Sequence, residues 1–141
     1  MSLTLLVGES NPYGVDPYYA LYPFPAHASG GRLARILGMS PDEYLGAFDR
    51  RNLLIGRRWS VVAAREEAGR LTHSRRVLLG ARVAAAHGLP FRPFTSTATH
   101  FGKVVILPHP SGRSRAWSDP ASVQRARDCV RPFILGTEPT P

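Results

Sequence analysis

Two polar segments of the sequence carry side chains that could do chemistry, and each directly follows a short apolar run. The first segment, residues 8–14 (GESNPYG), contains Asn11, and the second, residues 108–114 (PHPSGRS), contains His109. An asparagine amide oxygen can hold a water molecule, and a histidine ring N–H can donate to a developing negative charge. If both apolar runs are parallel strands, the two segments lie beyond the carboxyl edge of one sheet, where open α/β sheets bind their ligands.

Several common catalytic motifs do not occur in the sequence. There is no GxxxxGK[ST] phosphate-binding loop and no GxGxxG fingerprint, and Pro12 occupies the last position of what would otherwise be a GxSxG turn. The five histidines lack the spacing of metal ligands, and Cys129 is the only cysteine. We therefore expect no metal site, no cofactor and no internal disulfide.

The elements that must position the two segments follow from the apolar periodicity. Short apolar runs predict strands at residues 3–7, 53–55, 77–79 and 103–107, with a weaker candidate at 91–94. Helical spacing and capping residues predict helices at residues 31–37, from Ser40 onward, and at 61–71, 81–87 and 119–135. This alternation predicts the α/β class: a three-layer α/β/α sandwich with a mostly parallel central sheet of about four strands. We expect one domain over residues 1–136 and a frayed tail over residues 137–141.

The chain is strongly basic, with 18 lysine and arginine residues against 10 acidic ones and a formal net charge of +8. Seventeen of the basic residues are arginine, whose planar fork suits phosphate. The charge fits a nucleic-acid partner, although a general bias toward Arg, Ala, Gly and Pro would give the same balance. Arg75 and Arg76, at the start of a predicted strand, are expected to be an exposed pair. With no apolar run long enough to span a membrane and no secretory signal, we expect a cytoplasmic monomer.

The two polar segments resemble the motifs of a known enzyme family. Asn11-Pro12-Tyr13 is similar to the first motif of the uracil-DNA glycosylase superfamily, in which Asp or Asn precedes Pro. His109-Pro110-Ser111-Gly112 resembles the second motif, whose usual form is HPS followed by Pro or Gly. Phe24 falls twelve residues after Pro12, where uracil-cleaving members place the Phe that stacks on the flipped base. The resemblance extends over nearly the whole chain, which would be a short and divergent member.

The sequence departs from the family pattern at two places. The first motif normally has Gly two residues before its Asp or Asn, and here that position is Glu9, with Gly8 one residue earlier. Uracil-cleaving members end their second strand with an Asn that reads the edge of the base. At the corresponding turn this sequence has Leu54-Ile55-Gly56, so we expect no such amide there.

The resemblance implies a DNA glycosylase-like enzyme that flips a damaged or modified, uracil-type base out of DNA and hydrolyses its N-glycosidic bond. In that case His109 donates to the departing base and Asn11 orients the attacking water. The base would be held by four residues of the first loop region: Pro12, Tyr13, Tyr22 and Phe24. DNA would contact residues after the second and last strands: Arg57, Arg58, Ser111, Gly112, Arg113, Ser114 and Arg115. Two alternatives stay open, namely a non-catalytic module that binds nucleic acid or a nucleobase, and a hydrolase of free nucleotides.

Overall fold

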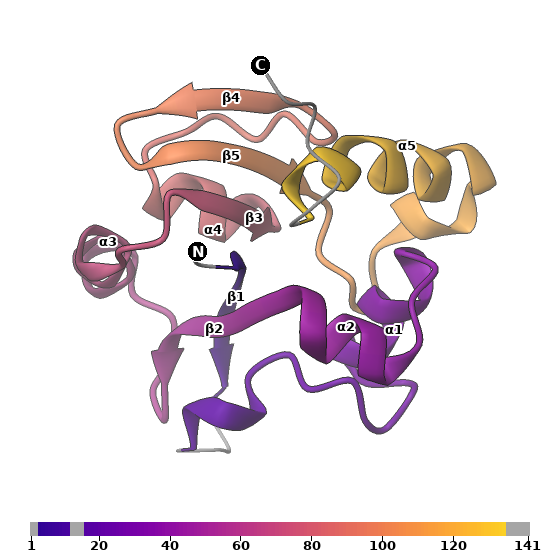
Figure 1. Ribbon diagram of the computed structural model, residues 1–141. Coiled ribbons are helices and arrows are strands. Elements are labelled where there is room, and N and C mark those ends of the chain that lie inside the picture. The colour runs from indigo at the N-terminus through magenta and orange to yellow at the C-terminus, as the bar shows by residue number, and fades with distance from the viewer. Residues whose placement is uncertain (1–2, 12–15, 135–141) are drawn as a thin grey trace.

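The computed structural model describes residues 3–11 and 16–134 of the chain. Five strands form one sheet in the order β2-β1-β3-β5-β4 (Figure 1). Their bounds are β1 (Thr4–Asn11), β2 (Phe48–Ile55), β3 (Arg75–Leu79), β4 (Ser96–Thr99) and β5 (Gly102–Leu107). Every pairing is parallel except that of β4 with β5. The predicted α/β class with a mostly parallel sheet is therefore confirmed, with one strand more than expected.

The additional strand is β4, and it does not coincide with the weaker candidate at residues 91–94. Phe94 has a φ of 63°, a left-handed conformation that interrupts an extended chain. The strand begins only at Ser96, and its sequence STAT is exposed along nearly its whole length. A polar edge strand of four residues has no buried face, so no apolar pattern marks it.

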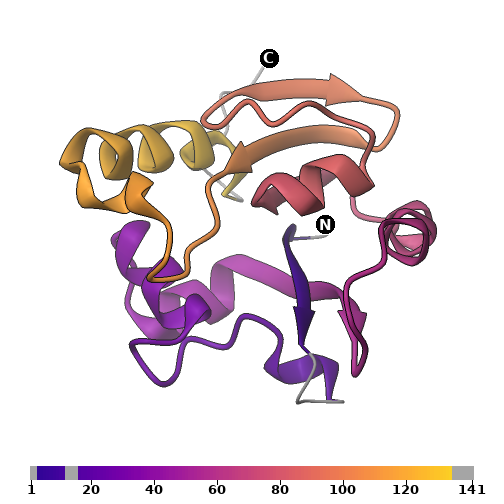
Figure 2. The ribbon, with the colours of Figure 1, turned by 180° about the vertical axis from the view of Figure 1, so that it is seen from behind.

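The sheet separates two hydrophobic clusters, as the three-layer prediction requires. Helices α1 (Ser29–Ile36), α2 (Pro41–Ala47) and α5 (Pro120–Val130) cover one face, whereas α3 (Val61–Arg70) and α4 (Ala81–Ala86) cover the other (Figures 1 and 2). Neighbouring strand residues point to opposite faces, so that Leu6 packs in the first cluster and Leu5 in the second. Three short 3-10 helices complete the elements: η1 (Pro17–Tyr19), η2 (Arg115–Ser118) and η3 (Arg131–Phe133). Across the described residues, no helix has the length and apolar character needed to cross a membrane.

Helix ends follow the capping chemistry of the sequence. The Ser40 side chain accepts a hydrogen bond from the Glu43 N–H, and the Glu43 carboxylate accepts one from the Ser40 N–H. The last helix is shorter than predicted: α5 ends at Val130, and Pro132 lies in the 3-10 turn that follows. Proline cannot donate the hydrogen bond that a longer α-helix would need at this position.

The expected exposure of Arg76 is wrong. Its side chain is only 2% exposed, on the face of the sheet covered by α3 and α4. The guanidinium donates to three backbone carbonyls, those of Ala68, Leu71 and His73. A fourth bond, of 3.1 Å, joins Arg76 Nη1 to Nε2 of the buried His87. This arginine therefore ties the end of α3 to the start of β3 and to α4.

Because the His87 ring is buried and neutral, we expect the protein to lose stability in acid. Its Nδ1 donates to the Val83 carbonyl, so its Nε2 must accept from Arg76, and the ring is held neutral. Burial lowers the pKa of His87 from 6.5 to about 4. Below pH 6.5 the unfolded chain takes up a proton that the folded protein does not, so the free energy of unfolding should fall by about 1.4 kcal/mol per pH unit.

The total loss expected between pH 6.5 and pH 4 is roughly 3 kcal/mol, and none is expected above pH 6.5. Urea unfolding across this range measures it, with His87→Gln compared against His27→Gln, since His27 is exposed. His87→Gln should lower stability at neutral pH and flatten the pH dependence, whereas His27→Gln should leave both unchanged. If the free energy of unfolding depended on pH equally in both variants, the His87 ring would have to be accessible to protons in the folded protein.

Candidate functional site

The two polar segments leave the sheet at the same edge. β1 ends at Asn11 and β5 ends at Leu107, with β3 running parallel between them. Residues from both segments, Glu9 and Ser10 from the first and His109 from the second, line one cavity of about 370 Å³. A cavity of this size is within the range of small-molecule binding sites.

Of the residues predicted to act in the first segment, the structure describes only part. The Asn11 backbone pairs with Ile55 of β2 at the carboxyl end of the sheet. The Asn11 side chain, Pro12 and Tyr13 lie outside what is described, as does the expected tail at residues 137–141. Their assigned roles stay predictions.

The cavity has an aromatic wall from the segment between β1 and α1. Tyr22 and Phe24, both predicted to hold a base, line it, and their ring centroids lie 5.9 Å apart. Phe24 is 55% exposed, which leaves its ring accessible to a planar ligand. The N-terminus of α1 adds Ser29 and Gly30 to the same wall.

His109 is held in one orientation and one tautomer. The Ser111 N–H donates to His109 Nδ1 at 3.1 Å, and Trp117 Nε1 donates to the His109 carbonyl at 2.9 Å. Because Nδ1 accepts, the neutral ring carries its proton on Nε2. Burial lowers the pKa of His109 below 6.5, although the negative charge of Glu9 opposes the shift. At neutral pH the ring is therefore an uncharged N–H donor.

Gly80 lies at the turn after β3, beside both His109 and Glu9. It follows β3 with a φ of 97°, a conformation that favours glycine. A Cβ on Gly80 would lie 3.4 Å from His109 Cβ and 3.6 Å from Glu9 Oε1. Arg82, on the helix that begins at this turn, places Nη1 3.8 Å from Glu9 Oε2 and partly offsets the charge of that carboxylate.

Asn52 is a cavity residue that sequence reasoning missed. It lies within β2 opposite Gly8 of β1, is 8% exposed and lines the same cavity as His109. The turn at Leu54-Ile55-Gly56 has no amide, as expected, but the strand supplies one earlier, because β2 is longer than its apolar run and Asn52 precedes that run. The available signal was Gly8: a Cβ there would lie 2.3 Å from Asn52 Oδ1, and a glycine inside a strand often marks such a close approach.

The residues predicted to contact DNA do not line the cavity of His109. Arg57 and Arg58 are exposed after β2, and Arg113 and Arg115 are exposed in and after the second motif. None of these four lines the cavity of His109. Ser111, Gly112 and Ser114 instead line a second cavity, of about 410 Å³.

Nothing in the described part of the chain gathers three or more His, Cys, Asp or Glu side chains that could hold a metal ion. Comparison with known proteins adds no further constraint on the site. No model of a protein family matches the chain, and no curated protein sequence matches it.

Proposed function

We propose that this protein is a DNA glycosylase-like hydrolase that takes a flipped, uracil-type base into the cavity of His109. The observation that carries the proposal is the composition of that cavity. A neutral histidine donor, a nearly buried amide (Asn52) and an accessible aromatic ring (Phe24) line one space of about 370 Å³. A nucleobase needs these three things: a stacking surface, hydrogen bonds to its edge, and a donor to the atom that becomes negative.

In the proposed reaction a water oxygen attacks C1′ of the sugar while the bond from C1′ to the base nitrogen breaks. The bonding electrons leave with the base as an anion, and the attacking water loses a proton to solvent. The base anion takes up a proton from solvent, so the products are a neutral free base and an abasic sugar with a hydroxyl at C1′. His109 Nε2–H donates a hydrogen bond to the departing base anion and stabilises it. The lowered pKa of His109 keeps the ring neutral, so the ring acts as an uncharged donor. Asn11, at the end of β1, is the candidate to orient the water.

A second candidate function is binding without cleavage. The observation that favours it is the amide at position 11, which can orient water but cannot carry the negative charge that would stabilise a cationic sugar or accept a proton. The same cavity would then hold a nucleobase, in nucleic acid or in a free nucleotide, and release it unchanged.

A cleavage screen separates these candidates. Labelled oligonucleotides carrying uracil, hypoxanthine, hydroxymethyluracil or a mismatch are incubated with the protein, and abasic sites are then broken with alkali. We expect excision of at least one base, and we expect Asn11→Asp to preserve or raise it because a carboxylate adds charge stabilisation. The matched control is Asp16→Asn, a carboxyl change in the same loop region on an exposed residue.

Two results would redirect the proposal. If neither the wild type nor Asn11→Asp excises any base, while a uracil-containing oligonucleotide still binds the protein and Phe24→Ala weakens that binding, the binding module replaces the enzyme. If free nucleotides are hydrolysed and oligonucleotides are not, the substrate is a nucleotide rather than DNA.

A further inference from the structure

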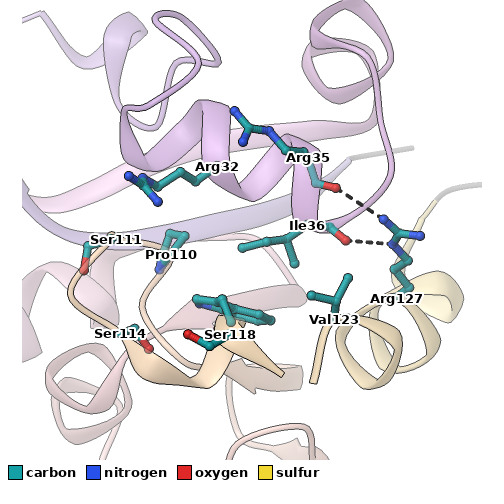
Figure 3. Close-up of a pocket in the computed structure, with 11 residues that line it drawn as sticks. Arg32, Arg35, Ile36, Pro110, Ser111, Ser114, Ser118, Val123 and Arg127 are labelled. Atoms are coloured by element: carbon teal, nitrogen blue, oxygen red, sulfur yellow. Dashed lines mark hydrogen bonds between the residues drawn. The ribbon is translucent and has the colours of Figure 1, made fainter. Parts of the chain in front are cut away.

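The second cavity has a strongly basic lining. It is about 410 Å³ in volume and lies between α1, α5 and the chain from Pro110 to Ser118 (Figure 3). Its charged and hydroxyl side chains are Arg32, Arg35, Arg127, Ser111, Ser114 and Ser118. No Asp or Glu lines it, and among the described residues no carboxylate lies within ion-pair distance of the three arginines.

The arginines are held in place by backbone carbonyls rather than by carboxylates. Arg32 Nε donates to the His27 carbonyl at 2.8 Å. Arg127 Nε donates to the Ile36 carbonyl at 2.8 Å, and its Nη2 lies 3.4 Å from the Arg35 carbonyl (Figure 3). Each guanidinium has five N–H donors, so these bonds fix the groups and leave further donors available to a ligand.

Gly112 brings one of these guanidinium groups against the His109 loop. A Cβ on Gly112 would lie 2.9 Å from Arg32 Nη2 and 3.1 Å from Arg32 Cζ. Any side chain at this position would displace the guanidinium from the cavity wall. The second motif thus forms one wall with its backbone, and α1 places a positive charge directly on it.

Three arginines and no carboxylate line this cavity, so its potential is positive and favours an anion. Arginine forks and serine hydroxyls together match the tetrahedral oxygens of a phosphate. The position relative to the first cavity favours a phosphate of a nucleic-acid strand: His109 lines the first cavity and Ser111 the second, and two residues span at most about 7 Å.

We propose that the cavity of Arg32, Arg35 and Arg127 binds a phosphate group, and that this phosphate flanks the nucleotide whose base occupies the His109 cavity. The assignment to a nucleic-acid strand rests on the proposed function. The phosphate site itself does not, because binding is measured without base excision.

The test is equilibrium binding of a fluorescent single-stranded oligonucleotide containing one uracil, measured over a series of salt concentrations. We expect the Arg32→Gln/Arg127→Gln double variant to weaken binding at least 10-fold. The slope of log K against log salt should fall by about 0.7 for each phosphate of the single strand that the variant no longer neutralises. Arg65→Gln, an exposed arginine of α3 on the opposite face of the sheet, is the matched control and should change neither value.

Two further measurements keep the test decisive. Arg127 also joins α5 to α1, so its replacement could disturb packing. Arg35 is exposed, and Arg35→Gln should weaken binding 3- to 10-fold while leaving the thermal midpoint of unfolding unchanged. An oligonucleotide with one neutral methylphosphonate next to the uracil should bind the wild type as weakly as the natural strand binds the double variant.

The outcomes separate the two sources of phosphate. If the double variant loses affinity for inorganic pyrophosphate but not for the oligonucleotide, the site takes a free polyphosphate. If the double variant, Arg35→Gln and Arg65→Gln bind both probes as the wild type does, the phosphate site is refuted, whatever the excision screen gives. If binding depends on these arginines but no base is excised, the phosphate site stands and the enzymatic proposal fails.

Discussion

Replacing His109 with alanine is expected to lower the rate of base excision by roughly 10²–10³-fold, with little change in DNA affinity. The reason is the loss of the neutral Nε2–H donor that the Ser111 N–H fixes in the cavity. The exposed arginines expected to contact phosphates do not line the cavity of His109, so binding should survive. Single-turnover cleavage of the best substrate in the screen, beside a binding titration, measures the two effects separately.

The pH profile distinguishes a donor from a structural residue. Because burial lowers the pKa of His109 below 6.5, the neutral ring persists as pH falls through 6.5. The wild-type rate should therefore decline only at lower pH, and His109→Ala should lose this limb of the profile. His27→Ala, at an exposed position, serves as the control. A variant that loses activity together with DNA binding or folding would assign His109 to the scaffold instead.

Replacing Arg76 with methionine is expected to lower the free energy of unfolding by about 3 kcal/mol, because a buried acceptor that loses its donor costs roughly 1–3 kcal/mol. The change leaves three backbone carbonyls and the His87 ring without their donor in a nearly solvent-free site. It also removes the guanidinium that lies 4.8 Å from the centroid of the Phe101 ring. Urea unfolding at neutral pH gives the difference directly.

Arg65→Met is the matched control, because it makes the same change on the exposed side of α3 and should stay within about 0.5 kcal/mol of the wild type. Arg76→Lys should recover only part of the loss, since an ammonium cannot reach all four acceptors in the plane of the fork. Similar stability for Arg76→Met and Arg65→Met would mean that water satisfies the exposed carbonyls.

The sheet and the common edge of the two polar segments could be predicted because they follow from local patterns. Buried parallel strands are continuous apolar runs, and Val77–Leu79 and Val104–Leu107 are of this kind. Parallel strands place their following loops at one edge, so Glu9 and His109 meet across β3 although 100 residues separate them in the chain.

The residues that sequence reasoning missed depend on neighbours distant in the chain. Asn52 is buried because β2 pairs with β1 beyond its own apolar run, and no local pattern records that pairing. Arg76 is buried because the end of α3 and His87 supply acceptors for it. The cluster of Arg32, Arg35 and Arg127 joins helices at opposite ends of the sequence. The polarity of Asn52 and Arg76 alone would place both side chains at the surface, although both are buried.

The close approach of Gly8 and Asn52 constrains how this cavity can change during evolution or design. A side chain at position 8 requires the Asn52 amide to move or to be shortened, because the two groups compete for the same volume. Substitutions at the two positions are therefore epistatic, and replacing Gly8 should cost less once Asn52 has been shortened. A library that varies position 8 alone should favour glycine, whereas a library that varies both positions together should open new cavity shapes and, with them, new base preferences.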